Sequence, residues 1–156
     1  LFGYTGSATV HAALGGARSS ITVDRSPVYC AWTHNNLMLN GFSREHHRVI
    51  RADCMQWLAQ CHERFDLVFA DPPTFSNRKS TDSVFDVQRD HVALIQLIMR
   101  HLAPDGLLIF STNFRRFQLD GKGLAGLRIT DISRATIPFD FQRNQRVHQC
   151  WEIRHS

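Results

Sequence analysis

The chain has 156 residues, of which 43% are hydrophobic and 21% are charged, and its 18 basic side chains exceed its 14 acidic ones by four. This length suits one compact domain with a real core, and no apolar run is long enough to span a bilayer. No signal peptide precedes the first element, and the chain starts without Met just before a glycine turn, so we expect a fragment whose first strand is missing.

The cysteines and charges indicate the compartment and the kind of partner. The four cysteines show no pairing rhythm, which favours reduced thiols in the cytoplasm, and Cys54, Cys61 and His62 lack a zinc spacing, so no metal is expected.

Residues 113–156 carry eight basic and four acidic side chains, whereas residues 1–112 carry ten of each. All but two of the 18 basic residues are Arg, whose planar guanidinium suits phosphate. We therefore expect a polyanionic partner, and the alternative is that these charges only form a solvated surface.

Strand-like and helix-like segments alternate along the chain. The expected strands cover residues 19–24, 47–53 and 64–71, the part of 103–113 that follows a turn, and about 127–137 and 146–154. The expected helices cover the stretch between Gly6 and Gly15 and residues 26–40, 54–62 and about 86–102. This alternation predicts an α/β fold with a doubly wound, mostly parallel sheet in one domain over residues 1–156. The last two strands should form a hairpin that adds an antiparallel strand at one edge, and residues 64–71 are apolar enough for the buried middle of a parallel sheet.

Polar residues stand at the carboxyl ends of the expected strands, where α/β sheets bind ligands. The turn from Gly3 to Gly6 lets the backbone approach a ligand, although tight packing explains such a turn equally well. Asp24 suits both hydroxyls of a ribose, or it is an acid at a helix N-terminus. Asp53 suits an adenine amino group, or it caps the helix that begins near Cys54.

The segment Asp71-Pro72-Pro73 is the most specific feature. Prolines of fixed φ can hold a carboxylate or a carbonyl toward a base or a methyl donor without reorganisation. Phe75 can stack on an extruded base, and the alternative is a proline-stiffened turn with this ring in the core. Three acids and a glycine turn at successive strand ends predict a common site for a nucleoside that carries a sulfonium.

Four segments together make the sequence recognisable: LFGYTGSATVHAALGGA, DPPTFSN, FDVQRDH and HQCW. They resemble the C-terminal catalytic module of the bacterial bifunctional large-subunit ribosomal RNA methyltransferases K/L. The resemblance implies a Rossmann-like class I fold that uses S-adenosylmethionine to methylate guanine N7 in 23S ribosomal RNA. It also implies that the full protein contains a companion N-terminal methyltransferase module and an RNA-binding THUMP domain.

The resemblance further implies roles for individual residues. The methionine end of S-adenosylmethionine would be lined by Phe2, Gly3, Tyr4, Thr5 and Gly6. Asp24 would hold the ribose, Asp53 and Cys54 the adenine, and Asp71 the surroundings of the sulfonium. Pro72, Pro73 and Phe75 would shape the base pocket, with Asn77 and Lys79 near the RNA.

The choice of acceptor atom follows from the loops. Methylation of a pyrimidine C5 needs a cysteine nucleophile, and DPPTFSN and FSTNFRRF contain none. Enzymes that methylate an exocyclic amine usually have an Asn or Asp followed by two prolines and then directly by an aromatic residue. Here Thr74 lies between Pro73 and Phe75, which weakens the match without excluding it. Guanine N7 loses no proton, so a site without an evident general base is enough. The residues alone favour N7 over guanine N2 as a preference, and the resemblance makes N7 the prediction.

Two further matters concern the partner and the competing classes. Arg115, Arg116 and Lys122 follow the strand expected within residues 103–113, and Arg143 and Arg146 precede the last strand. We expect these five residues to bind RNA phosphates. A catalytically silent RNA-binding module stays open as an alternative. A nicotinamide-dependent oxidoreductase is disfavoured by the glycine pattern and by the Asp-Pro-Pro loop.

Overall fold

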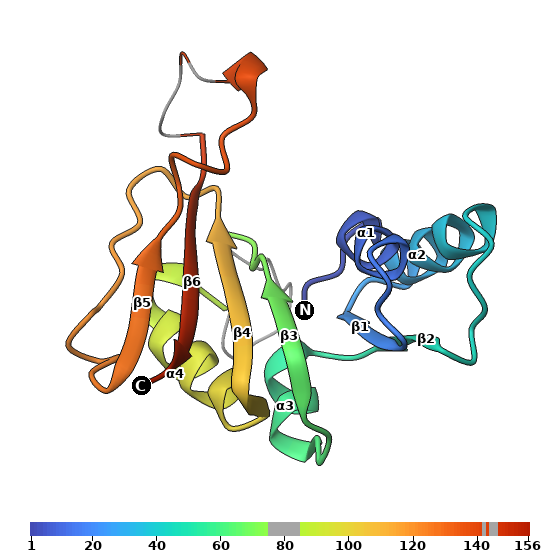
Figure 1. The fold of residues 1–156 in the computed structure, drawn as a ribbon, viewed down its shortest axis with the longest axis horizontal. Helices are drawn as coiled ribbons and strands as arrows, with labels where there is room; N and C mark the ends of the chain where they lie inside the picture. The colour runs from blue at the N-terminus through green and yellow to red at the C-terminus, as the bar shows by residue number, and fades with distance from the viewer. Residues whose placement is uncertain (75–84, 142, 144–146) are drawn as a thin grey trace. The chain divides into compact units, whose positions relative to one another are not determined.

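The computed structural model describes residues 1–74, 85–141, 143 and 147–156. It forms two compact units, Leu1–Cys61 and His62–Ser156, which we call the N-terminal unit and the C-terminal unit. Each unit has its own sheet, blue to teal in the first and green to red in the second (Figure 1). Within the described ranges, no helix is long and apolar enough to cross a membrane.

The N-terminal unit combines a parallel pair of strands with helices. In chain order its elements are α1 (Ser7–Leu14), β1 (Ser20–Asp24), α2 (Pro27–Leu39), β2 (His47–Arg51) and α3 (Cys54–Gln60). β1 pairs with β2 in parallel, with Asp24 opposite Arg51, so both strands end at the same edge. The predicted start of the second helix is confirmed, because Ser26 Oγ accepts the Tyr29 N–H at 3.3 Å.

The C-terminal unit contains a mixed sheet and one long helix. Its elements are β3 (Phe65–Ala70), α4 (Val87–Met99), β4 (Leu102–Thr112), β5 (Leu127–Asp131), a 3-10 turn (Phe139–Phe141) and β6 (Gln149–His155). The strand order is β3-β4-β6-β5, with β3 parallel to β4 and the other neighbours antiparallel. The predicted antiparallel hairpin is confirmed, but the last strand lies inside the sheet and β5 takes the edge (Figure 1).

The core of the C-terminal unit is aromatic where β4 meets β6. Phe110 and Trp151 are opposite each other in the antiparallel pair, with ring centroids 6.0 Å apart. Phe117 packs against both, at 5.9 Å from Phe110 and 5.4 Å from Trp151. Leu94 and Ile95 of α4 are fully buried. The rings fix the segment after β4 onto the sheet.

Some predicted boundaries are wrong. The helix predicted to reach residue 102 ends at Met99, and β4 already begins at Leu102. The turn predicted at the start of residues 103–113 is an irregular stretch within β4, where the register with β3 shifts. Pro104 lies in this stretch and has no N–H to donate to a ladder. The first late strand ends at Asp131 instead of near residue 137.

The prediction that residues 64–71 form a fully buried strand is wrong in part. Ala70 is buried, but Leu67 and Phe69, which share a face of β3, are 53% and 39% exposed. β3 lies at the end of the strand order, and α4 is the one α-helix that the structure describes in this unit. A single helix covers one face of a sheet, so an apolar strand can keep its other face exposed.

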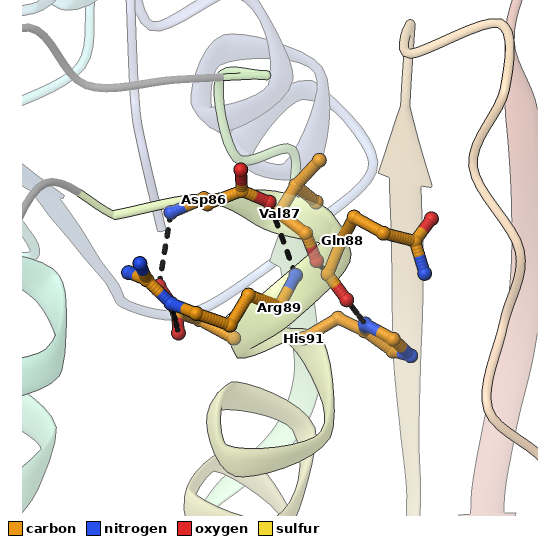
Figure 2. A network of polar contacts seen from close by, with 6 residues as sticks. Asp86, Val87, Gln88, Arg89 and His91 are labelled. Atoms are coloured by element: carbon orange, nitrogen blue, oxygen red, sulfur yellow. Dashed lines mark hydrogen bonds and ion pairs between the residues drawn. The ribbon is translucent and has the colours of Figure 1, made fainter.

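Reciprocal hydrogen bonds fix the N-terminus of α4 (Figure 2). Asp86 Oδ1 accepts the Arg89 N–H at 3.0 Å, and the Asp86 N–H donates to Asp90 Oδ2 at 2.9 Å. Arg89 Nε donates to Asp90 Oδ1 at 2.7 Å, and this bond holds the pKa of Asp90 below its ordinary value. One turn further, His91 Nε2 accepts the Asp120 N–H at 3.0 Å and ties α4 to the segment after β4.

Candidate functional site

The loop before α1, residues 1–6, has an unusual backbone, and we call it the glycine loop. Phe2 and Tyr4 have positive φ angles of 58° and 46°, and Gly6 has a φ of 78°. A non-glycine residue in this region costs of the order of 1–3 kcal/mol and persists only where its surroundings fix it. The glycine loop therefore needs external support.

That support comes from hydrogen bonds to the main chain of the glycine loop. They join Phe2 N–H to Cys54 Sγ (3.4 Å), Gly3 N–H to Val23 O (3.2 Å), Tyr4 N–H to Asp24 Oδ2 (3.0 Å), Thr33 Oγ1–H to Tyr4 O (3.2 Å) and Asn36 Nδ2–H to Thr5 O (2.8 Å). The partners come from the end of β1, the middle of α2 and the start of α3. The surrounding elements thus set the shape of this loop.

The two glycines of the loop are required by packing within the protein. A Cβ on Gly3 would collide with Thr22 Cγ2. A Cβ on Gly6 would lie 2.6 Å from Thr33 Cγ2 and 2.9 Å from Thr33 Cα, and the positive φ of Gly6 adds strain. Tight packing, one of the two explanations open from the sequence, therefore accounts for both glycines without any ligand.

Asp24 links the glycine loop to the start of α2. Its Oδ2 accepts the Tyr4 N–H at 3.0 Å, and its Oδ1 accepts the Ser26 N–H at 2.8 Å. A carboxylate oxygen has two lone pairs, so each oxygen can accept one more hydrogen bond. The carboxylate is fixed in place and still has acceptor capacity.

Asp53 and Cys54 occupy the start of α3. Asp53 caps this helix, since its Oδ1 accepts the N–H groups of Met55 at 3.1 Å and Gln56 at 3.2 Å. The buried Cys54 thiol donates to Val23 O at 3.5 Å, and burial raises its pKa to about 11. Because β1 and β2 are parallel, Asp24 and Asp53 lie at the same edge of the N-terminal sheet. The predicted convergence of Asp71 with them stays a prediction.

Asp71 follows the last residue of β3 and is exposed. Ser111 Oγ, near the end of β4, donates to Asp71 Oδ1 at 2.7 Å. Pro72 is buried and Pro73 is exposed. Thr74 Oγ1 donates to Asn113 Oδ1 at 3.1 Å. These two bonds join the ends of the parallel strands β3 and β4 and restrict the orientation of the Asp71 carboxylate.

Arg115 and Arg116 are the two central residues of a turn. The Phe117 N–H donates to the Phe114 carbonyl oxygen at 3.0 Å, which closes the turn. Gln149 Nε2 donates at 3.2 Å to the carbonyl oxygens of both Phe114 and Phe117. The ring of Phe117 is buried while both arginines are exposed. The turn is therefore fixed at its base and presents two guanidinium groups to solvent.

The remaining predicted residues are only partly described. Arg143 is exposed in a turn. The predicted residues outside the described ranges are Phe75, Asn77, Lys79 and Arg146. Among the described residues, no group of three or more His, Cys, Asp or Glu could hold a metal ion.

Several supporting residues were missed by sequence reasoning. Thr33 and Asn36 hold carbonyl groups of the glycine loop, and their spacing of one helical turn was an available signal. Ser111 bonds to Asp71 from 40 residues away in the sequence. Gln149 bonds to Phe114, at the turn that contains Arg115 and Arg116, from 35 residues away. Gln149 belongs to the recognised segment HQCW, but nothing in that segment indicates its partners.

Comparisons with known proteins identify the family of the chain. A family model described as Conserved hypothetical protein 95 matches residues 1–115. The chain belongs to this family. It is 56% identical over 154 residues to the protein of Desulfotalea psychrophila named Ribosomal RNA large subunit methyltransferase K/L, and 51% identical over 157 residues to the protein of that name from Vibrio cholerae.

The alignments with these relatives cover 99% of the chain and 21% and 22% of the relatives, so the chain spans about a fifth of their length. The predicted resemblance to the methyltransferases K/L is confirmed. The module of those relatives to which the chain corresponds stays a prediction.

Solved structures confirm the predicted α/β methyltransferase fold. The crystal structure of the methyltransferase SMU.776 complexed with SAH matches with a TM-score of 0.82 at 26% identity, over 97% of this chain and 43% of that one. A SAM-dependent methyltransferase from Streptococcus mutans matches with a TM-score of 0.79 at 25% identity, over 97% and 42%. The ribosomal protein L11 methylase of Lactobacillus delbrueckii shares the fold, with a TM-score of 0.69 at 19% identity, over 97% and 65%.

Proposed function

We propose that this chain is a methyl-transfer module that uses S-adenosylmethionine to methylate guanine N7 in 23S ribosomal RNA. The observation that carries the proposal is the 56% identity, over 99% of the chain, with a protein named Ribosomal RNA large subunit methyltransferase K/L. The likeness to a methyltransferase complexed with SAH supports the donor. The choice of N7 rests on the motifs of the sequence and on the chemistry of the loops. We further propose a companion methyltransferase module and a THUMP domain in the full-length protein.

The N-terminal unit would hold the donor. S-adenosylmethionine supplies a methyl carbon on a positively charged sulfur. The ribose hydroxyls fit the acceptor capacity that Asp24 retains beside its bonds to Tyr4 and Ser26. Asp53 uses Oδ1 for both cap bonds, so its other oxygen can accept from the adenine amino group. The N–H groups at the start of α1, which follow Gly6, suit the donor's carboxylate.

Cys54 would serve the donor site through its position and not through its thiol. The thiol is buried, protonated at neutral pH and engaged with Phe2 N–H and Val23 O. Its main chain, in the first turn of α3, is the part that can meet an adenine ring beside Asp53. The structural role of the thiol is to tie α3 to the glycine loop.

The C-terminal unit would hold the acceptor. Guanine presents N–H donors on N1 and N2, and Asp71 can accept from them while Ser111 fixes its Oδ1. The buried Pro72 restricts the backbone behind this carboxylate. N7 already carries an in-plane lone pair, so the enzyme needs to orient it and has no proton to remove. Orientation alone can supply about 7–11 kcal/mol of the barrier.

The thiols of Cys54 and Cys150 are unsuited to methylation of a pyrimidine C5. That reaction needs a thiolate that attacks C6 of the base. Burial raises the pKa values of Cys54 and Cys150, which keeps both thiols protonated at neutral pH. Each is also buried in the interior of its unit. Neither has the exposure or the ionisation that a nucleophile requires.

Nucleoside mass spectrometry tests the proposal. Unmodified 23S ribosomal RNA is incubated with S-adenosylmethionine and the intact protein that carries this chain, and its nucleosides are scored for 7-methylguanosine. We expect this product from the parent protein and a large loss in Asp24→Asn, because the amide cannot replace a charged acceptor for two hydroxyls. Asp66→Asn is the matched control, since Asp66 is exposed near the amino end of β3 and away from its carboxyl end.

Other products would replace the proposal with its alternatives. Formation of N2-methylguanosine would favour the exocyclic amine. RNA binding without any methylated nucleoside would favour the silent RNA-binding module. Equal activity of Asp24→Asn and Asp66→Asn would remove Asp24 from the donor site.

A further inference from the structure

An aromatic surface borders the glycine loop in the N-terminal unit. Tyr4 of this loop meets Tyr29 of α2 edge to face, with ring centroids 4.7 Å apart, and Tyr29 lies 6.2 Å from Trp32, one turn along the same helix. Tyr4 is 58% exposed and Trp32 is 48% exposed. We call these three rings the aromatic ledge. Tyr29, which contacts both of the other rings, is half-buried, so the three rings form one contiguous aromatic surface. Exposed apolar surface of this kind marks an interaction site.

The backbone of the aromatic ledge is fixed at two of its three residues. Tyr4 is held at a φ of 46° by a bond from its N–H to Asp24 and by a bond from Thr33 to its carbonyl oxygen. The Tyr29 N–H donates to Ser26 Oγ at the start of α2. A planar ligand would meet rings on a preorganised main chain, which lowers the entropy lost on binding.

The charges around the aromatic ledge suit a polyanion. Residues 1–44 contain one carboxylate side chain, Asp24, and three arginines. Both oxygens of Asp24 already accept main-chain N–H groups. Arg25 is exposed in the turn that leads into α2, and α2 itself carries no Asp, Glu, Lys or Arg. A phosphate backbone beside the rings would therefore meet little repulsion, and Arg25, four residues before Tyr29 in the sequence, offers a positive charge.

We propose that the aromatic ledge stacks an unpaired nucleotide of the RNA substrate. The proposal rests on the proposed function in taking RNA as the partner. It adds Tyr29 and Trp32, which lie outside the proposed donor and acceptor residues, to the RNA-binding surface. The ledge is continuous with the donor loop, because Tyr4 belongs to both and is bonded to Asp24. Aromatic rings stack on every base, so this surface would contribute affinity and position but little sequence selectivity.

The aromatic face of Trp32 is the feature to test. The affinity of the intact protein for a short single-stranded RNA is measured by anisotropy for Trp32→Ala, Trp32→Leu and Trp32→Phe. We expect Trp32→Ala and Trp32→Leu to weaken binding by roughly 5- to 150-fold, the loss of one stacked base, and Trp32→Phe to keep most of the affinity. The slope of affinity against salt should not change in any variant, because no charge is removed.

Leu39→Ala is the matched control, since Leu39 is 82% exposed on the same helix and lies outside the ledge. It should bind RNA like the parent protein. Trp32→Leu keeps an apolar side chain at a half-exposed position, and chemical denaturation of each variant shows that loss of binding is not loss of folding. If Trp32→Leu and Leu39→Ala bind RNA equally well, or if the parent protein binds no RNA, the proposal is overturned.

A second experiment tests whether Trp32 contacts an RNA base or the adenine of the donor. S-adenosylhomocysteine is titrated without RNA, and the Trp32 variants should bind it like the parent protein. Weaker binding of S-adenosylhomocysteine with unchanged RNA affinity would assign the ring to the donor and overturn the proposal. If the parent protein transfers no methyl group but the Trp32 variants still bind RNA more weakly than the parent, the proposed reaction is rejected. The RNA-binding role of the aromatic ledge is then supported independently of that reaction.

Discussion

In the N-terminal unit the candidate residues are joined through main-chain hydrogen bonds, whereas in the C-terminal unit Asp71, Arg115 and Arg116 are exposed on backbone that other residues fix. Asp24 and Thr33 bind the backbone of the glycine loop directly. The turn that contains Arg115 and Arg116 is held by its flanking residues, Phe114 and Phe117. Gln149 donates hydrogen bonds to the carbonyl oxygens of both. In the first unit, binding and folding share the same contacts. In the second unit, a functional side chain can be removed without loss of the hydrogen bonds that fix the backbone around it.

The strongest test of this difference is Gly6→Ala in the glycine loop. The new Cβ would lie 2.9 Å from Thr33 Cα at a φ of 78°, so it meets backbone that cannot move aside easily. Left-handed strain of about 1–2 kcal/mol and overpacking of about 1–3 kcal/mol predict a loss of about 2–5 kcal/mol in the free energy of unfolding. Urea denaturation measures this loss, and donor affinity should fall with it.

Gly16→Ala is the control for Gly6→Ala. Gly16 has a φ of 92°, but a Cβ there would meet no atom within 4 Å. Only the backbone strain of about 1–2 kcal/mol should remain. Equal destabilisation by the two substitutions would show that packing against Thr33 does not restrict the glycine loop.

The double substitution Arg115→Ala/Arg116→Ala should have the opposite profile. Both side chains are exposed, so the free energy of unfolding should change by no more than about 0.5 kcal/mol. If each arginine binds one phosphate, the slope of log affinity against log salt should decrease by roughly 1.4 to 1.8. Filter binding of RNA across a salt series measures it.

The matched control for the two arginines is Arg64→Ala/Arg100→Ala. These arginines are also exposed, but they precede β3 and β4 and so lie at the amino ends of the strands. The control should leave the salt slope unchanged. Should both double variants lower the slope equally, RNA binding would depend on overall charge and not on the turn after β4.

Local features of both units could be predicted from the sequence. Ser26 before Pro27 gave the start of α2, and the acids at strand ends were placed correctly because periodicity and capping depend on neighbouring residues. For Asp53, the capping role that the sequence left open is present in the structure. The donor role that it also left open stays a prediction.

Pairings between distant residues could not be predicted. Ser111 reaches Asp71 across 40 residues, and Gln149 reaches Phe114 across 35. Both depend on the strand order β3-β4-β6-β5, and alternation of strands and helices does not specify the place of a late hairpin. The exposure of Leu67 was missed for a related reason, because an apolar strand does not reveal how many of its faces are covered.

The smallest effect that we predict is a pH dependence confined to the N-terminal unit. His47 is buried on β2, its Nδ1 lies 2.9 Å from Ser20 Oγ on β1, and its ring packs against Phe42. Burial, followed by the nearby His46, holds the pKa of His47 below its ordinary value. The unfolded chain, with a pKa near 6.5, then binds more protons, so stability is complete above about pH 6.5 and falls as the pH drops toward the folded value.

Denaturation midpoints of His47→Asn between about pH 7 and pH 5 test this linkage, since the amide can bond to Ser20 but does not titrate in that range. The variant should lose less stability on acidification than the parent, while part of the decline remains because burial also lowers the pKa of His34. His11→Asn, at an exposed position on α1, should follow the parent curve. Parallel curves for His47→Asn and the parent would mean that the packing of β1 on β2 does not depend on the protonation of this ring.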